Sequence, residues 1–203
     1  MPGSPRIFAA VEGIVDEAVA RRLIKEAGGI PGTVYNCEGK DSLRKKVKGF
    51  NNAAKREPWL VLVDLDADAS CAPSLRQTWL PVPAPWLCIR IAVRQVEAWL
   101  MADAESLAAY LGVAKRKIPD NPEALPDAKS AMVNLARISR RRDIRQDMVP
   151  RPSSGRKVGP AYTSRLVEYV ENHWQPARAV QHANSLRKAI NCLEQLVSQW
   201  GCQ

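Results

Sequence analysis

The stretch from Trp59 to Ser70 constrains the fold of this chain more than any other. An apolar run, Leu60 to Val63, leads directly into acids at alternate positions, Asp64, Asp66 and Asp68. A short continuous apolar run of this kind is typical of a central strand covered on both faces of a sheet. The acids begin where that strand should end, and open α/β sheets place their ligands at the carboxyl ends of strands.

Three carboxylates at one strand end require a positive partner, because unpaired like charges repel and raise one another's pKa. A hard divalent cation meets this requirement, since it takes oxygen ligands and keeps several waters. The sequence therefore predicts Mg²⁺ (or Mn²⁺) as a cofactor at the end of this strand.

Strands and helices are expected to alternate along the first half of the chain. The expected strands besides the one at Trp59 are Arg6–Val11, Thr33–Tyr35 and Trp86–Val93, and the expected helices are Asp16–Ala27, Lys40–Arg56, a short segment through Leu75 and Trp79, and Gln95–Leu111. This order predicts an α/β fold with a mostly parallel sheet and helices on both of its faces.

The second half of the chain has a different character. We expect a helix from Asp127, which would cap it, to about Ile138, and two helices between Tyr162 and Trp200 that are broken near Pro176. Between them, residues 137–157 hold eight basic residues and two acids. The predicted organisation is a catalytic core, 1–112, and a helical extension with a basic linker, 113–203, packed on that core.

The charge balance indicates a polyanionic partner. The net charge of +9 is high for 203 residues, and nucleic acid is the simplest partner for such a surface. The five cysteines form no CxxC motif, which argues against a disulfide framework or a zinc site. No stretch has the length and apolarity of a signal peptide or a membrane span. We therefore expect a soluble, cytoplasmic protein with no membrane partner.

A second pair of acids follows the expected first strand. Glu12 comes directly after that strand, and Asp16 lies four residues later at the start of a helix. A turn leading into a helix would aim both side chains at one point, and Gly13 would let the chain turn tightly behind Glu12. Strand ends can be neighbours in a parallel sheet, so these carboxylates can converge with those of Asp64 and Asp66.

Another interpretation stays open for the single acids. Asp66 or Asp68 would then cap a helix, and Asp16 and Glu17 would only favour a helix N-terminus. This interpretation explains the whole set less well, because capping does not require an acid directly after each of two core strands. For Asp68 a helix cap is the better explanation.

Two other acidic motifs fit the sequence poorly. An EF-hand loop needs glycine and glutamate where this chain has Ala69 and Leu75. A haloacid-dehalogenase-like phosphatase also opens with a strand and Asp-x-Asp. It normally has Thr or Val at the position of Asp68 and a later acidic pair, which we do not find.

The segments Val11–Glu17 and Val63–Asp66 together resemble the TOPRIM domain. Topoisomerases, bacterial primases, recombination proteins and overcoming-lysogenization-defect (OLD) nucleases share that domain. Its pattern is a glutamate after the first strand and Asp-x-Asp after a later one. The Glu-Gly-x-x-acid form found here, with Asp16 as the second acid, is similar to the OLD-like branch.

A third segment, Ile91–Asp103, is similar to the Glu-x-Glu-x-Trp-Leu-x-Ala-Asp pattern of small stand-alone TOPRIM-like bacterial proteins, the family labelled DUF4276. Gln95 replaces the first glutamate of that pattern, so only Glu97 carries over. Glu97 would support a second metal ion or orient the other ligands. A salt bridge to a nearby arginine such as Arg94 is the alternative.

The resemblance implies Mg²⁺-dependent phosphodiester chemistry. Glu12 and Asp16 would bind the metal or act as a general base, and Asp64 and Asp66 would bind the metal. Independently of the resemblance, Lys157 lies in a glycine-flanked basic loop and could stabilise charge on a phosphoryl group, although a flexible linker has the same composition. The expected catalytic residues are Glu12, Asp64, Asp66, Glu97 and Lys157, and the expected metal ligands are Glu12, Asp16, Asp64 and Asp66.

The predicted function is a Mg²⁺-dependent nuclease for DNA or RNA, with Lys40–Arg56 and Arg137–Lys157 lining a groove for the nucleic-acid backbone. Family analogy suggests a role in bacterial defence against phage, beside a separately encoded ATPase, and it allows a homo-oligomer. The alternative is a non-catalytic TOPRIM module that binds nucleic acid or a partner protein such as that ATPase. A phosphatase is a third hypothesis.

Overall fold

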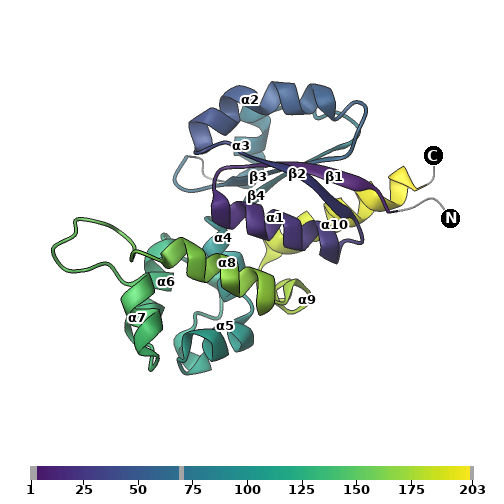
Figure 1. Ribbon diagram of the computed structural model, residues 1–203. Helices are drawn as coiled ribbons and strands as arrows, with labels where there is room; N and C mark the ends of the chain where they lie inside the picture. The colour runs from purple at the N-terminus through teal and green to yellow at the C-terminus, as the bar shows by residue number, and fades with distance from the viewer. Residues whose placement is uncertain (1–3, 69–70, 202–203) are drawn as a thin grey trace. The chain divides into compact units, whose positions relative to one another are not determined.

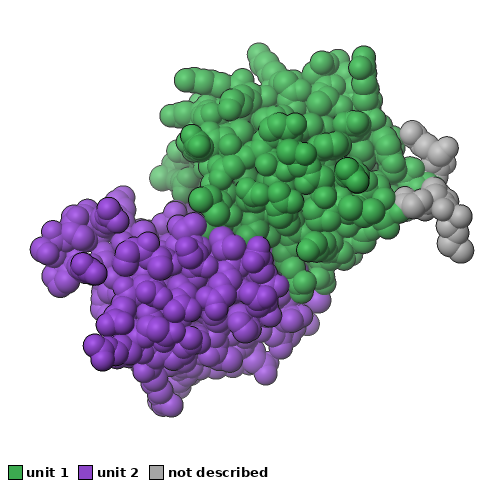
Figure 2. Space-filling model, in the orientation of Figure 1, with its two compact units in different colours: residues 1–93, 184–203 green, residues 94–183 purple. Residues whose placement is uncertain are grey.

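The computed structural model describes residues 4–68 and 71–201 of the chain (Figure 1). Packing divides the chain into two compact units, which Figure 2 colours separately. Unit 1 comprises Met1–Val93 and Asn184–Gln203, and unit 2 comprises Arg94–Ala183. The expected boundary after residue 112, between a core domain and a helical extension, stays a prediction.

Unit 1 is built on a parallel sheet. Its strands in the described part of the chain are β1 (Arg6–Val11), β2 (Ile30–Asn36), β3 (Trp59–Asp64) and β4 (Leu87–Ala92). They lie in the order β2-β1-β3-β4, and each neighbouring pair is parallel. The expected mostly parallel α/β sheet is therefore confirmed, with every described strand running in the same direction.

Helices cover both faces of this sheet, as expected. Helices α2 (Lys40–Ala53) and α3 (Ala72–Trp79) lie on one face, and α1 (Ile14–Glu26) and α10 (Asn184–Trp200) lie on the other (Figure 1). Because both faces are covered, the β3 residues from Trp59 to Val63 are all buried. The apolar run Leu60–Val63 thus lies in an inner strand covered on both faces, as its composition predicts.

The C-terminal helix α10 belongs to unit 1 although it lies far from the sheet in the sequence. It packs against β4, and the Val93 N–H donates a hydrogen bond of 3.3 Å to the Ser185 hydroxyl at its start. At its other end, the Trp200 and Trp86 rings meet edge to face, with their centroids 4.9 Å apart. The chain therefore leaves the sheet after β4 and returns to complete the covering of one face.

Unit 2 is helical. Its fully buried aromatic side chains include Trp99, Tyr169 and Trp174. The described helices of unit 2 are α4 (Val96–Met101), α5 (Ala104–Leu111), α6 (Ala128–Arg137), α7 (Arg142–Met148), α8 (Tyr162–Asn172) and α9 (Pro176–Ala179), with short 3₁₀ turns at Lys115–Lys117 and Pro122–Ala124.

Two helices of unit 2 differ from expectation. The single helix expected over Gln95–Leu111 is wrong, because Asp103 interrupts it: its side chain accepts a hydrogen bond from the Ser106 N–H and starts α5 as a new helix. The basic segment 137–157 contains α7, which was not expected. Ile144 and Met148, four residues apart, bury one side of that short helix.

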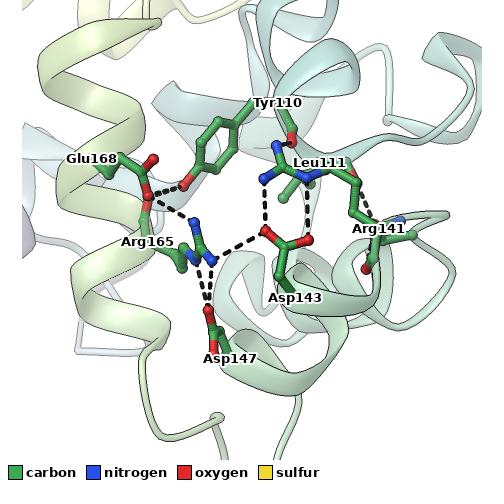
Figure 3. Close-up of polar contacts among 8 residues, drawn as sticks. Tyr110, Leu111, Arg141, Asp143, Asp147, Arg165 and Glu168 are labelled. Atoms are coloured by element: carbon green, nitrogen blue, oxygen red, sulfur yellow. Dashed lines mark hydrogen bonds and ion pairs between the residues drawn. The ribbon is translucent and has the colours of Figure 1, made fainter.

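An ion-pair network joins α5, α7 and α8 (Figure 3). The Arg165 guanidinium on α8 lies 3.1 Å from Asp143, 2.7 Å from Asp147 and 3.0 Å from Glu168. The Tyr110 hydroxyl on α5 lies 3.0 Å from the same Glu168 oxygen that Arg165 binds. The planar guanidinium can meet three acids at once because it presents five donors in a fixed fork.

The described helices include none with the length and apolarity that crossing a membrane requires.

Candidate active site at the carboxyl ends of β1 and β3

The order of the strands places the two acidic segments next to each other. Strand β1 pairs with β2 on one side and with β3 on the other. The chain therefore goes from β1 to β2 in one direction and reaches β3 on the opposite side of β1. In open α/β sheets this switch in strand order opens a crevice at the carboxyl ends of the strands, where ligands bind. Glu12 follows β1, and Asp64 ends β3.

The structure brings Glu12 and Asp64 into direct contact. The Asp64 backbone N–H donates a hydrogen bond of 2.8 Å to Oε1 of Glu12. Burial raises the pKa of the Glu12 carboxyl, and this effect outweighs the Asp64 hydrogen bond and the positive charge of Lys40, which both act to lower it. A nearby positive charge would stabilise the ionised form of this buried carboxylate.

Lys40 provides positive charge at this edge of the sheet. It is the first residue of α2, and its Nζ lies 3.0 Å from Oδ2 of Asp66 and 2.6 Å from Oδ2 of Asp68. It also donates a hydrogen bond of 3.3 Å to the Leu65 carbonyl. Burial alone would lower the pKa of the Lys40 ammonium, but its bonds to Asp68 and Asp66 prevail and raise it. Lys40 is therefore charged at every physiological pH.

The backbone after β3 adopts an unusual conformation. Asp66 has a positive φ of 49°, in the left-handed region that aspartate and asparagine visit more readily than most residues. The turn aims the Asp66 carboxylate at Lys40. The preference for Asp68 as a helix cap is wrong, because α3 begins at Ala72 after an N-cap at Cys71, and Asp68 instead pairs with Lys40.

Asp16 occupies the first turn of α1 and is only 9% exposed. The chain bends at Glu12 and Gly13, as expected, but the bend does not require a glycine backbone, because the φ of −151° at Gly13 is extended backbone that any residue can adopt. The lack of a side chain matters for another reason. A Cβ at position 13 would lie 3.1 Å from Oδ2 of Asp16, so glycine leaves room for that carboxylate at the start of the helix.

These acids do not form a ready-made metal cluster. Within residues 4–68 and 71–201, no group of three or more His, Cys, Asp or Glu side chains has an arrangement that could hold a metal ion. Two pairings are present instead: Glu12 with the backbone of Asp64, and Lys40 with Asp66 and Asp68. As ligands the carboxylates suit Mg²⁺, because hard cations take oxygen donors. Oδ2 of Asp66 is already held by Lys40.

Glu97 lies in unit 2 and is 2% exposed. Its Oε1 accepts a hydrogen bond of 3.2 Å from the Tyr162 hydroxyl and lies 3.7 Å from the Lys129 ammonium. Its Oε2 is buried and has no hydrogen-bond partner among the described residues. The ion-pair alternative therefore involves Lys129, and the role expected of Glu97 at the metal stays a prediction.

Lys157 also lies in unit 2, in the loop between α7 and α8. Its side chain is exposed. Hydrogen bonds from Ser130 lower the pKa of Asp127, and the charge of Lys157 adds to that effect. Asp127 caps α6, as expected, by accepting a hydrogen bond of 2.8 Å from the Ser130 N–H. The catalytic role expected of Lys157 stays a prediction.

Sequence reasoning missed Lys40 and Tyr162 as partners of the candidate acids. Lys40 stands directly after Gly39, at the start of the helix that follows β2. Strand β2 borders β1, so a basic residue at this position lies beside the carboxyl end of β1. The position of Lys40 in the sequence was therefore the signal that could have identified it as a partner of the acids. Tyr162 meets Glu97 from 65 residues away, and no local pattern indicates that contact.

No family model, curated protein or solved structure matches this chain.

Proposed function

We propose that this protein is a Mg²⁺-dependent phosphodiesterase that cleaves nucleic acid at the carboxyl ends of β1 and β3. The observation that carries the proposal is the contact between Glu12 and the Asp64 backbone. It joins two acidic segments that are 52 positions apart in the chain, at the edge of the sheet where α/β proteins bind ligands. The net charge of +9 supports a polyanionic substrate.

The side chains at this edge divide the chemical tasks among them. If Glu12 does not bind the metal ion itself, it is suited to accept a proton from a water molecule, because burial raises its pKa toward neutral pH. The Lys40 ammonium is suited to neutralise a phosphate oxygen, since it is held at the same edge and stays charged. Asp66 and Asp68 hold that ammonium in place.

The residues that would hold Mg²⁺ are Glu12, Asp64 and Asp66, with Asp16 on the first turn of α1. Their oxygen donors fit the preference of this ion. When bound, it would polarise a phosphoryl oxygen and lower the pKa of a water ligand. Lys40 holds Asp66 and Asp68 close together.

The test is cleavage of labelled single-stranded and double-stranded DNA and RNA in Mg²⁺ or Mn²⁺. Asp64→Asn and Asp66→Asn should each lower the rate at least about 100-fold, because they remove a proposed metal ligand. Asparagine is the informative replacement at position 66, since it tolerates the positive φ and keeps the fold.

The matched control is Asp41→Asn, which removes an exposed acid from the first turn of α2 and so changes the net charge equally. It should leave the rate unchanged. The proposal is wrong if wild-type protein cleaves none of the four substrates with either metal, or if both site variants keep the wild-type rate.

A second function, a non-catalytic module that binds nucleic acid or a partner protein, is favoured by one specific observation. Lys40 already pairs with both Asp66 and Asp68. Metal-independent binding of nucleic acid, with no cleavage by wild-type protein, would support this function. A separately encoded ATPase as partner and a role in phage defence stay predictions that rest on the TOPRIM resemblance.

A further inference from the structure

An aromatic cluster lies at the outer edge of the sheet in unit 1. The Tyr35 ring on the edge strand β2 stacks on Trp59, with centroids 5.6 Å apart and planes 25° apart. It also contacts the Phe50 ring of α2, with centroids 5.9 Å apart. Trp59 is only 5% exposed, whereas Tyr35 is 46% exposed. The inner rings thus support Tyr35 from behind and leave much of it open to solvent.

A basic hollow opens beside this tyrosine. It has a volume of about 500 Å³, in the range of small-molecule sites. No acidic side chain lines it in the described part of the chain, and Lys45 and Lys46 are both exposed there. The lining residues are Tyr35, Asn36, Cys37, Lys45, Lys46, Gly49 and Phe50.

The hollow borders the edge of the sheet that carries the acids. Asn36 ends β2 and pairs in register with Val11, the residue before Glu12. The Cys37 N–H donates to the Val11 carbonyl at 2.9 Å, and the Gly39 N–H donates to the Glu12 carbonyl at 2.8 Å. A ligand that fills the hollow is therefore held against the backbone that positions Glu12.

We infer that this hollow binds single-stranded nucleic acid, with one base stacked on Tyr35 and the adjoining phosphates on Lys45 and Lys46. An exposed aromatic ring beside lysines is how sequence-tolerant proteins hold single strands, because every base has a face to stack. A duplex does not fit this arrangement, since its bases are already stacked on one another. The inference deepens the proposed function, on which it rests for the choice of nucleic acid as ligand.

The same helix offers a matched control. Lys48 is exposed like Lys46, but it lines a different hollow, between α2 and α3, that includes Thr78 and Trp79 and not Tyr35. Lys46→Ala and Lys48→Ala therefore change the net charge of one helix equally. Only the first removes a phosphate contact beside the stacking tyrosine.

The test is binding of fluorescent oligo(dT) and oligo(rU), and of the matching duplexes, by full-length protein in EDTA so that no cleavage occurs. Tyr35→Leu should weaken binding to the single strands about 10-fold, while Tyr35→Phe keeps the affinity. Lys46→Ala should weaken it and reduce the slope of log K against log salt by about 1, and Lys48→Ala should do less. Thermal unfolding is the control that checks whether each variant is folded.

The inference is overturned if folded Tyr35→Leu binds the single strands as wild type does, or if Lys46→Ala and Lys48→Ala have equal effects. It is also overturned if Tyr35→Leu weakens duplex binding as much as single-strand binding. Binding in EDTA is independent of catalysis, so this result still stands if the protein proves not to be a nuclease. If Tyr35→Leu binds single strands normally while wild-type protein cleaves nucleic acid, the inference is wrong and the proposed function still stands.

Discussion

Two clusters in this protein each place three carboxylates around a central cation, but they pair those carboxylates differently, and the second cluster also contains Arg141, which pairs with Asp143. In unit 1, Lys40 faces Asp66 and Asp68, and Glu12 lies within reach of its field. In unit 2, Arg165 faces Asp143, Asp147 and Glu168. Each cluster has one central cation and three carboxylates, but only the second pairs every carboxylate directly with a guanidinium.

The pKa directions show the consequence of this difference. A hydrogen bond from Arg141 lowers the pKa of Asp143 in unit 2, so that acid is stable as an anion. Burial raises the pKa of Glu12 in unit 1, so that acid is costly as an anion. A saturated network holds helices together, whereas an undercompensated one retains a capacity to bind further positive charge. We therefore interpret the network in unit 2 as one that stabilises the fold, and the acids in unit 1 as candidates for a functional site.

The largest expected effect comes from removing the two central cations. Arg165→Ala should lower the free energy of unfolding by about 1–3 kcal/mol, because it leaves three carboxylates without a shared donor. Lys40→Ala should lower it by less, since Lys40 pairs with two carboxylates and Arg165 pairs with three. Urea denaturation measures both values.

Millimolar Mg²⁺ sharpens this comparison. The ion should restore part of the stability lost in Lys40→Ala, because the carboxylates that Lys40 held become its ligands, and it should restore none in Arg165→Ala. Equal recovery in both variants, or recovery in neither, would mean that the two clusters do not differ as described. The conservative Arg165→Lys should still lose stability, since lysine lacks the planar fork.

A smaller effect of opposite sign is expected from Glu12→Gln in metal-free buffer. The amide keeps an oxygen to accept the Asp64 N–H and removes a partly buried charge. We expect a gain on the order of 0.5 kcal/mol in stability near neutral pH, together with the loss of activity. Such a gain is typical of active-site residues whose electrostatic cost is tolerated for function.

The pH dependence of that gain follows from the raised pKa of Glu12. The folded protein holds the Glu12 proton to a higher pH than the unfolded chain, so wild type loses stability as the pH rises from the unfolded value through the folded one. The stability difference between Glu12→Gln and wild type should therefore be near zero below about pH 4.3 and reach its full size above the folded pKa. A difference that shrinks as the pH rises would contradict the assigned direction.

Much of the fold could be predicted from the sequence because short apolar runs mark buried parallel strands. The run before Asp64 and the segment Arg6–Val11 both form strands where expected. The helix over Gln95–Leu111 could not be predicted correctly, because its interruption depends on one side chain, Asp103, whose carboxylate is also fixed by the distant Gln175 N–H. The packing of α10 on β4 is likewise a long-range contact.

For the site, the sequence predicted that the two acidic segments lie together but not that Lys40 pairs with the second of them. Glu12 and Asp64 follow adjacent parallel strands, which a motif can reveal. Lys40 is one of seven basic residues in the segment 40–56, and its special position depends on the strand order. The expected site also treats Asp66 as a metal ligand, whereas in the structure Asp66 pairs with Lys40.

The most direct test of the central claim is the position of Mn²⁺ in crystals of the full-length protein soaked in this ion. We predict an anomalous peak at the carboxyl ends of β1 and β3, about 2.0–2.2 Å from carboxylate oxygens of Glu12 and Asp64, with Asp66 turned from Lys40 toward the ion. Crystals that show no ion there at saturating Mn²⁺, with Lys40 still bound to Asp66 and Asp68, would contradict the claim.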